Sequence, residues 1–449
     1  MPISPARKVA YEVLRRVESG RAFAVDLLQG PQVASLREVD RRLATELVMG
    51  VLRWRGELDF QIERLSGKPL KYFDPEIAAI LRLSIYQIQF LEKVPKSAAV
   101  NEAAELTKAV RKRSAVGLVN AVLRKCEASK RRLSAQGIRQ PDPAVMQTLR
   151  HSFPAWLLER WQRNFGSEAA QALAWASNLV PPTTLRVCQG KREDVERLLT
   201  AEGIHAAPGK YAGQALVVRS GNVQASSALS EGRVVIQDEA SQLVGTLVAP
   251  EAGQRLLDLC AAPGIKTSQL AGALGRGTLV ACDLSAQRLA TMVRLLPKRV
   301  WPDPQMFLIR LDAARELPFA RTFHRILLDV PCSGTGTLAR NPEIKWRLQP
   351  KDLTRLAGIQ ERMLRNALEV LAPGGRLVYA TCSLEPEENE EVVEAVLSAT
   401  PDFRKLTSAE LSREFPALAS LFDAHGYFRT RPDLHSMDGF FAAVILRAQ

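Results

Sequence analysis

The sequence predicts a multidomain protein with an all-α part, a small α/β module and a larger α/β domain built on a parallel sheet. Three observations predict this fold class. The chain has 449 residues, which exceeds the length of one ordinary core. Apolar residues follow a helical spacing up to about residue 130. Beyond about residue 235, short apolar strands alternate with amphipathic helices.

The N-terminal part, residues 1–132, reads as a helical domain. From Asp74 onward, apolar side chains recur at intervals of three and four, at Ile77, Leu81, Ile85 (or Ser84), Ile88 and Leu91. Asp74 suits the N-cap and Pro75 the first helical position. The stretch from Asn101 to Cys126 repeats this pattern, and we expect Gly117 to break it.

The middle of the chain changes character twice. Residues 133–143 are rich in turn residues and prolines, which favours a linker. The stretch TTLRVCQGKREDVERLLTAEG, residues 183–203, reads as a strand, a turn and a helix. A small α/β module is therefore expected over residues 144–235.

The C-terminal part, residues 236–449, carries the alternation of strands and helices. We expect a helix over 352–371 and strands at 255–260, 278–283, 307–312, 325–330 and 376–382. Such alternation predicts a parallel sheet covered on both faces, with a ligand crevice at the carboxyl ends of its strands. Five residues whose side chains could take part in binding or catalysis fall at these ends. They are Asp283, Asp312, Asp329, Cys332 and Cys382.

The charge is positive and unevenly distributed. There are 61 Lys and Arg residues against 48 Asp and Glu, and residues 1–132 hold 25 basic and 15 acidic side chains, a net +10 of the total +13. This concentration favours a polyanionic partner, most plausibly nucleic acid. The alternative is a solvated basic face that serves solubility.

The six cysteines, 126, 188, 260, 282, 332 and 382, contain no C-x-x-C pair. This spacing argues against a zinc site and a disulfide framework, so we expect no metal and reduced thiols. No run approaches the roughly 20 apolar residues of a membrane span. We therefore expect a cytoplasmic protein. Packing is the expected role of Cys126, Cys188 and Cys282.

The stretch LLDLCAAPGIKTSQLAGAL places a turn of small residues between a strand and a helix. Backbone amides and the helix N-terminus can therefore approach a ligand at residues 260–266, where Cys260 could line the turn. Asp283 lies 19 residues after Gly264 and suits the two hydroxyls of a ribose. The alternative role of Asp283 is a helix cap.

Two thiols near an adenosine cofactor suggest S-adenosylmethionine and an acceptor carbon that needs activation. Carbon 5 of cytosine is such a carbon, because it becomes nucleophilic only after a thiolate adds to carbon 6. Asp329, in the sequence DVPC, is placed to stabilise that adduct. These residues alone leave open whether Cys332 or Cys382 is the nucleophile.

Four motifs in this order carry a resemblance to a known family: CAAPGIKTSQLA, DVPCSGTGTLARNPEIKW, YATCSLEPEENEEVV and DGFFAAVIL. They closely resemble motifs of the RNA cytosine-5 methyltransferases of the Nop2/Sun type. The N-terminal helices resemble the NusB-type RNA-binding domain. This fusion is characteristic of a bacterial ribosomal RNA methyltransferase.

The resemblance implies roles for individual residues. Cys382 would attack carbon 6 of the cytosine, Cys332 would assist product release, and Asp329 would contact the target base at the border of the cofactor site. Asp283 would hold the ribose and Asp312 the adenine side. The methionine part would lie on Cys260, Ala261, Ala262, Pro263, Gly264, Ile265 and Lys266.

Ile265 departs from the family, which usually has a glycine there. A β-branched residue resists positive φ, so either this turn needs no left-handed residue or it has shifted.

The full expectation is an all-α NusB-like domain, an RRM-like RNA-binding module and a Rossmann-like class I methyltransferase domain with a mostly parallel, seven-stranded sheet. This monomer would methylate an unpaired or flipped cytosine of small-subunit ribosomal RNA, with the resemblance implying cytosine 967 of 16S rRNA. The alternatives are an RNA-binding assembly or antitermination factor with an inactive methyltransferase fold, a cytosine-C5 methyltransferase acting on another RNA, and DNA cytosine methylation. In the DNA enzymes the thiol after proline would be the nucleophile, whereas the second strand-end thiol here favours RNA.

Overall fold

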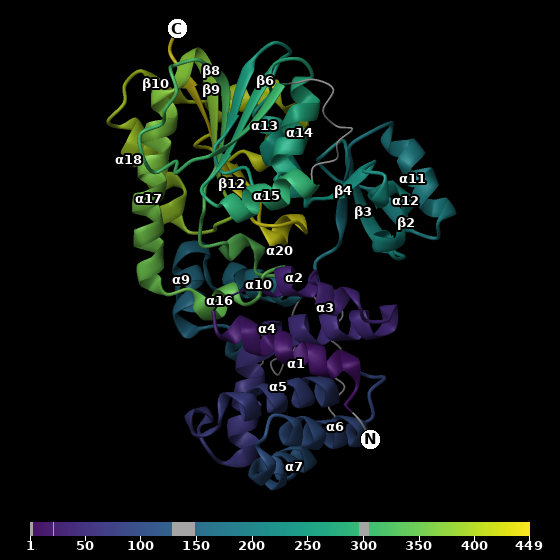
Figure 1. The fold of residues 1–449 in the computed structure, drawn as a ribbon. Helices are drawn as coiled ribbons and strands as arrows, with labels where there is room; N and C mark the ends of the chain where they lie inside the picture. Colours follow the sequence, from purple (N-terminus) through teal and green to yellow (C-terminus); the bar gives the residue numbers. More distant parts are fainter. Residues whose placement is uncertain (1–2, 21, 128–148, 296–304) are drawn as a thin grey trace. The chain divides into compact units, whose positions relative to one another are not determined.

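The computed structural model (Figure 1) describes residues 3–20, 22–127, 149–295 and 305–449. The predicted linker, 133–143, lies outside the described residues. Internal contacts divide the chain into two compact units. Unit 1 comprises Met1–Val180 and Leu338–Leu348, and unit 2 comprises Pro181–Thr337 and Gln349–Gln449. The bounds of the three predicted domains stay predictions.

Unit 1 is helical throughout its described residues. Its elements are α1 (Pro5–Glu18), α2 (Ala24–Leu28), α3 (Pro31–Ala34), α4 (Glu38–Ser66), η1 (Leu70–Tyr72), α5 (Pro75–Phe90), α6 (Lys96–Ala109), η2 (Arg113–Ala115), α7 (Val116–Lys125), α9 (Ala155–Phe165), α10 (Ser167–Asn178) and α16 (Ile344–Arg347).

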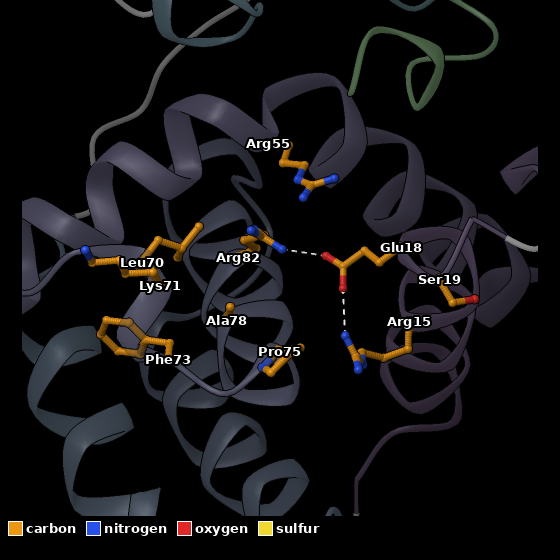
Figure 2. A pocket seen from close by; sticks show the side chains of 10 residues that line it. All are labelled: Arg15, Glu18, Ser19, Arg55, Leu70, Lys71, Phe73, Pro75, Ala78 and Arg82. Atoms are coloured by element: carbon orange, nitrogen blue, oxygen red, sulfur yellow. Dashed lines mark hydrogen bonds and ion pairs between the residues drawn. The ribbon is translucent and has the colours of Figure 1, made fainter. Parts of the chain in front are cut away.

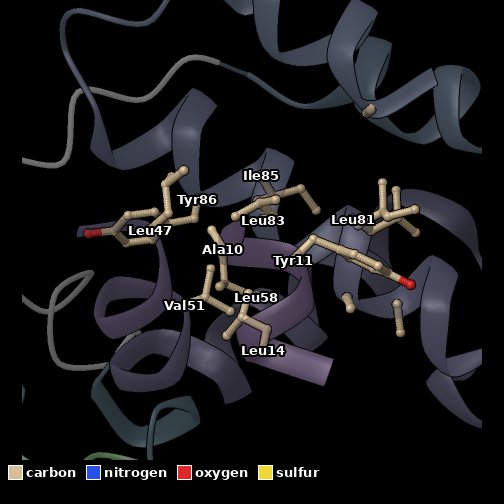
Figure 3. Close-up of a cluster of buried hydrophobic side chains, with 14 of the residues drawn as sticks. Ala10, Tyr11, Leu14, Leu47, Val51, Leu58, Leu81, Leu83, Ile85 and Tyr86 are labelled. Carbon is tan, nitrogen blue, oxygen red and sulfur yellow. The ribbon is translucent and has the colours of Figure 1, made fainter. Parts of the chain in front are cut away.

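The core of unit 1 forms around α5, which is buried on nearly all sides. The predicted apolar positions Ile77, Leu81, Ile85 and Ile88 are all buried, and Pro75 opens the helix as expected. Figure 3 shows side chains of α1, α4 and α5 gathered into one cluster. A helix that is apolar all round needs neighbours on every side, and α1, α4, α6 and α7 supply them.

The predicted helix break at Gly117 is wrong. The chain turns earlier, at Arg111, whose φ of 63° is left-handed, and Gly117 lies inside α7. A methyl group on Gly117 would meet no atom within 4 Å. The arginine supplies the left-handed residue that a helix end commonly needs, so the glycine is free to stay helical.

The segment Leu338–Leu348 belongs to unit 1, although unit 2 elements flank it in the sequence. The ammonium of Lys345 donates to the carbonyl of Arg53 (2.9 Å) and to Asn178 Oδ1 (2.7 Å), and lies 3.9 Å from the ring centre of Phe153. Burial holds the pKa of Lys345 well below its usual range. Trp346 adds a hydrogen bond to the carbonyl of Leu52 (2.9 Å).

Unit 2 contains a small antiparallel sheet with strand order β2-β3-β1-β4. The elements of this module are β1 (Thr184–Val187), α11 (Arg192–Ala201), β2 (His205–Pro208), β3 (Ala215–Ser220), η3 (Val223–Ala225), α12 (Ser227–Ser230) and β4 (Val234–Ile236). The predicted strand, turn and helix over 183–203 are confirmed as β1 and α11.

The larger sheet of unit 2 has the order β10-β12-β9-β8-β5-β6-β7, and β11 pairs with β12 beside this path. From β9 to β7 every pairing is parallel, whereas β12 lies antiparallel to β9. The predicted seven-stranded, mostly parallel sheet is confirmed, with β11 as a short addition. The strands are β5 (Arg255–Asp258), β6 (Thr278–Asp283), β7 (Gln305–Arg310), β8 (Phe323–Asp329), β9 (Leu371–Thr381), β10 (Phe403–Lys405), β11 (Phe428–Arg429) and β12 (Phe441–Arg447).

Helices cover both faces of this sheet (Figure 1). Adjacent strand residues enter different clusters: Leu256 packs on one side with α13 and α14, and Leu257 on the other with α17 and α18. This follows because successive strand residues point to opposite faces. The remaining elements are α13 (Glu239–Leu247), α14 (Ile265–Leu274), α15 (Ala286–Leu295), η4 (Thr335–Thr337), α17 (Pro350–Glu369), η5 (Pro386–Glu388), α18 (Glu390–Leu397), α19 (Ser408–Glu414), η6 (Pro416–Leu421) and α20 (Pro432–His435).

None of the described helices combines the length and the apolar character that crossing a bilayer requires.

Two glycines of unit 1 give opposite predictions for substitution by alanine. A methyl group at Gly50, within α4, would overlap the phenol ring of Tyr86, which is held by a hydrogen bond to Glu46 (2.6 Å). We expect Gly50→Ala to destabilise the protein by about 1–3 kcal/mol through overpacking. Gly117→Ala, in open space, should instead stabilise it by up to about 1 kcal/mol. Urea unfolding checks both, and a shift of the same sign for the two variants would contradict the packing argument.

Candidate active site

Two cysteine loops meet at the carboxyl edge of the larger sheet. The last residue of β8, Asp329, pairs with Ala380 near the end of β9, so the loops that follow start side by side. The sulfurs of Cys332 and Cys382 lie 3.1 Å apart, and the amide of Cys382 donates to the sulfur of Cys332 (3.3 Å). Both cysteines are half-buried as residues. The predicted placement of both cysteines at strand ends is therefore confirmed.

The buried carboxylate of Glu388 accepts hydrogen bonds from both loops. Its Oε1 accepts hydrogen bonds from the amide of Ser333 (2.8 Å) and from Gln360 Nε2 (2.9 Å). Its Oε2 accepts from the hydroxyl of Ser383 (2.6 Å). Ser333 and Ser383 each follow one of the cysteines, so a single side chain fixes both thiols relative to one another.

The residues around Glu388 complete this junction. Asn389 accepts a hydrogen bond from Thr381 Oγ1 (2.5 Å) and donates to the carbonyl of Ser383 (3.0 Å). The hydroxyl of Tyr379 donates to the carbonyl of Glu388 (2.6 Å). The acid-rich stretch after Cys382 therefore turns two glutamates inward, Glu385 and Glu388, and the second joins the two loops. We did not expect Glu388 from the sequence, where the only signal was an acid close after the cysteine.

The environment keeps Cys332 protonated at neutral pH. Its hydrogen bond with Cys382 raises the pKa of the Cys332 thiol well above the usual value, and burial raises it further. The charges of Cys382, Glu388 and Asp329 act in the same direction. A thiol in these surroundings resists forming a thiolate while its neighbour is charged.

Lys266 connects the predicted cofactor turn to the thiols. Its ammonium pairs with Asp329 (2.8 Å) and lies 4.9 Å from the ring centre of Phe440. Burial alone would lower the pKa of this lysine, but the charge of Asp329, its hydrogen bond with Asp329 and the charge of Cys382 together outweigh burial, so the pKa is raised. We expected Lys266 only as part of the turn, whereas its side chain pairs with Asp329 and is influenced by the charge of Cys382.

The turn itself resolves the question that Ile265 raised. Gly264 is the left-handed residue, with φ 100°, and Ile265 is the first residue of α14, so no positive φ falls on the isoleucine. The peptide between Ala262 and Pro263 is cis. The amide of Ala261 donates to the carbonyl of Cys282 (2.8 Å), which ties the turn to β6.

Cys260, at the start of the turn, is partly exposed, and burial of its sulfur raises the pKa of its thiol well above the usual value. The nearby charges of Asp258, Asp329 and Asp283 act in the same direction. Of the three cysteines expected to pack, Cys126 and Cys282 are buried and Cys188 is partly exposed.

Asp283 and Asp312 stand at the ends of the next two strands. Asp283 accepts hydrogen bonds from the amides of Ala262 (3.3 Å) and Ser285 (2.9 Å), so it both borders the turn and leads into α15. Asp312 accepts from the amide of Ala314 (3.0 Å). These groups fit S-adenosylmethionine. The carboxylates of Asp283 and Asp312 can accept hydrogen bonds from the cofactor, including its ribose hydroxyls, and the N-terminus of α14 favours the negative carboxylate of its methionine part.

Asp258, the last residue of β5, lies buried beneath the turn and was not expected from the sequence. Thr267 donates a hydrogen bond to its Oδ2 (2.7 Å). Burial raises the pKa of Asp258 to about 7 despite that hydrogen bond, and the charge of Asp329 adds to the rise. A strand-end acid was the available signal, but its burial could not be read from the sequence.

Three family models match successive parts of the chain. The NusB family matches residues 4–128, the ferredoxin-like domain of RsmF/B-like methyltransferases matches 153–224, and the 16S rRNA methyltransferase RsmB/F model matches 245–446. With the doubly wound sheet and the acids at its edge, these matches define an S-adenosylmethionine-dependent methyltransferase with a NusB domain.

Curated relatives match over nearly the whole length. The chain is 36% identical over 447 residues to the ribosomal RNA small subunit methyltransferase B of Pseudomonas putida, covering 98% of each chain. It is 32% identical over 449 residues to the probable ribosomal RNA small subunit methyltransferase B of Bacillus subtilis, again covering 98% of each. The chain therefore belongs to the ribosomal RNA small subunit methyltransferase B family.

Solved structures share the fold. The crystal structure of PH0851 aligns with a TM-score of 0.79 at 24% identity and covers 99% of each chain. A methyltransferase homolog protein from Pyrococcus horikoshii aligns with a TM-score of 0.57 at 28% identity, covering 68% of this chain and all of the other.

Asp258 predicts a pH dependence of stability. Because its pKa is about 7 in the folded protein and 3.8 ordinarily, the folded state holds a proton that the unfolded chain releases. Stability from this group is complete below about pH 4 and is lost as the pH rises to about 7, by at most about 1.4 kcal/mol per pH unit. Asp258→Asn keeps an acceptor for Thr267 and should flatten this slope. Urea unfolding of both proteins between pH 4 and 8 tests it; parallel curves would refute the assignment.

We predict that removing the carboxylate of Glu388 makes both cysteine loops less rigid at the same time. In Glu388→Ala the donors of Ser333, Gln360 and Ser383 lose their acceptor, at a cost of about 2–4 kcal/mol. We expect a lower unfolding midpoint and faster alkylation of Cys332 and Cys382 by iodoacetamide. Glu361→Ala is the control, because the side chain of Glu361 is 37% exposed and its ion pair with Arg365 spans 3.8 Å. Unchanged alkylation in Glu388→Ala would show that the carboxylate does not hold the loops.

Proposed function

We propose that this enzyme methylates carbon 5 of a cytosine in small-subunit ribosomal RNA, with Cys382 as the nucleophile. The observation that carries the proposal is the pair of thiols 3.1 Å apart, next to Asp329 and Lys266 at the carboxyl edge of the sheet. The RNA substrate is supported by the names of the curated relatives. Cytosine 967 is the target that the family resemblance favours.

Cys382 would act by adding its thiolate to carbon 6 of the ring. Addition converts the ring to an enamine, which makes carbon 5 nucleophilic. When bound, S-adenosylmethionine supplies the methyl group. Asp329 would contact the ring beside the reacting carbons, and the ammonium of Lys266 holds that carboxylate in place at 2.8 Å. Positioning of this kind matters because small displacements of reacting groups slow a reaction strongly.

Cys332 would serve the second half of the reaction. After methyl transfer, the proton on carbon 5 must leave before Cys382 can be expelled from carbon 6. Its raised pKa keeps Cys332 as a thiol during the attack by Cys382. Once Cys382 is bonded to carbon 6 and no longer charged, Cys332 would release its proton to solvent, and its thiolate would then take the proton of carbon 5. The electrons of that C–H bond form the double bond between carbons 5 and 6 and expel Cys382 as a thiolate. This supports the division of roles that the family resemblance implies, which the position of the two cysteines at strand ends left open.

Access to carbons 5 and 6 requires the base to leave a helical stack. The target cytosine would therefore be unpaired or flipped into the crevice. The basic residues of the N-terminal part would contribute phosphate contacts that position the RNA. A factor that only binds RNA would not need two thiols and Glu388 in this arrangement, so the catalytic role is favoured.

Substitution of each thiol tests the proposal. With ribosomal RNA and methyl-labelled cofactor, Cys382→Ala should lose about 10³-fold or more of the methylation rate, because it lacks the nucleophile. Cys332→Ala should accumulate a covalent RNA complex, visible as a band retained in denaturing gels. Cys188→Ala, a partly exposed thiol in the small module, is the control.

Methylation by Cys382→Ala at the rate of the control would refute the assignment of the nucleophile. Bisulfite sequencing of the product identifies the modified cytosine, and modification at another position would correct the target.

A further inference from the structure

The first turn of α14, residues 265–268, is held by side chains from two parts of unit 2. Lys266 pairs with Asp329 (2.8 Å), at the end of β8. Thr267 donates a hydrogen bond to Asp258 (2.7 Å), at the end of β5. Both of these contacts come from the larger sheet. The two remaining residues of the turn instead contact a side chain of the small module.

That side chain is Arg186, on β1. Its Nη2 donates to the hydroxyl of Ser268 (2.6 Å) and to the carbonyl of Ile265 (3.4 Å). Its Nε donates to Oε1 of Gln237 (2.6 Å), the residue directly after β4. The hydroxyl of Ser268 in turn donates to the carbonyl of Ile265 (2.8 Å). The guanidinium therefore connects the small sheet to both the backbone and a side chain of this helical turn.

Amide side chains reinforce the same connection. Gln237 donates to Oε1 of Gln269 (3.1 Å), and Gln269 donates to the carbonyl of Gln242 (2.7 Å). Gln242 donates to the carbonyl of Leu185 (3.3 Å), the neighbour of Arg186 on β1. The contact between β1 and α14 therefore rests on several hydrogen bonds that pass through α13.

The charge of Arg186 is accommodated differently from that of a buried arginine in unit 1. Arg82 lines a cavity of about 600 Å³, where it pairs with Glu18 (dashed line in Figure 2) and with Asp59 (3.0 Å). Burial alone would lower the pKa of Arg82, but these carboxylates raise it. Arg186 is only 6% exposed and has no ion pair among the described residues, and burial lowers its pKa. Because an arginine keeps its proton, the three neutral oxygens that it contacts must stabilise the cation.

A cation against the first turn of a helix is unfavourable by itself, because the helix N-terminus already carries partial positive charge. An anionic ligand at the same turn would remove this conflict. We propose that Arg186 is a positioning residue of the cofactor site, which aligns the first turn of α14 and adds positive charge where the carboxylate of the methionine part would bind. The small module thereby takes part in cofactor binding. The inference concerns the cofactor alone, so it does not depend on which base is methylated.

Isothermal titration calorimetry of the full chain with S-adenosylmethionine tests this role without RNA and without turnover. We expect Arg186→Met to weaken cofactor binding about tenfold, because the charge and both contacts with α14 are lost. Arg186→Lys keeps the charge but not the planar fork of donors, so its affinity should be intermediate. Arg219→Met is the matched control, because Arg219 is an exposed arginine on β3 of the same sheet, and it should bind like the wild type.

Ser268→Ala separates positioning from a general loss of stability. This smaller change removes only the hydroxyl that accepts from Arg186, and we expect it to weaken cofactor binding about fivefold. In the Arg186→Met background the same substitution should have no further effect, because the two groups act as a pair. The amide of Ser268, which donates to the carbonyl of Gly264 (2.8 Å), should exchange its hydrogen faster in Arg186→Met.

Wild-type cofactor affinity in Arg186→Met, even with a lower unfolding midpoint, would make this arginine a structural residue only and overturn the proposal. An equal effect of Ser268→Ala with and without Arg186, or an equal loss in Arg219→Met, would overturn it as well. If Arg186→Met does not fold, Arg186→Lys replaces it in the same comparison with Ser268→Ala. Binding is measured without RNA, so failure here leaves the reaction proposed for Cys382 untouched.

Discussion

The buried carboxylate of Glu388 is the constraint on which the arrangement of the thiols depends. A charge removed from water needs a full set of hydrogen bonds, and here the donors come from both cysteine loops and from α17. If either loop moved away, the carboxylate would lose a donor that water could not easily replace. Because separating the loops would leave the buried carboxylate without donors, Glu388 holds together the two cysteine loops, which lie about fifty residues apart in the sequence.

The order of strands arranges the remaining groups along one edge. Proceeding from β9 through β8, β5 and β6 to β7, the strand ends present Cys382, Asp329, the turn with Lys266, Asp283 and Asp312. The two thiols and Asp329 thus lie at the β9 end of this edge, and Asp283 and Asp312 lie at the β7 end. The small-residue turn lies between them. A parallel sheet gives this sequence of groups without any special loop, because all its carboxyl ends face the same way.

Much of this edge could be predicted from the sequence, because local patterns determine it. The apolar runs located the strands that end near Asp283 and Asp329, and their alternation with helices predicted the parallel order. The role of Glu388 could not be predicted, because its burial depends on loops that meet only after the sheet has formed. Arg111 shows the same limit on a smaller scale. The left-handed residue that ends α6 is an arginine, whereas the sequence directed attention to Gly117.

Two of the buried basic residues of unit 1, Arg82 and Lys345, show that a charge can be accommodated in different ways. Arg82 is surrounded by the carboxylates of Glu18 and Asp59, and their charges raise its pKa despite burial. Among the residues that the structure describes, Lys345 meets the carbonyl of Arg53, the amide oxygen of Asn178 and aromatic faces, and burial lowers its pKa. A lysine can respond by losing its proton, whereas an arginine effectively cannot. Arg55 lies between these cases, because it has both a carboxylate, that of Asp59 at 3.9 Å, and an aromatic face, that of Trp346 with its ring centre 5.6 Å from the guanidinium carbon, while burial lowers its pKa.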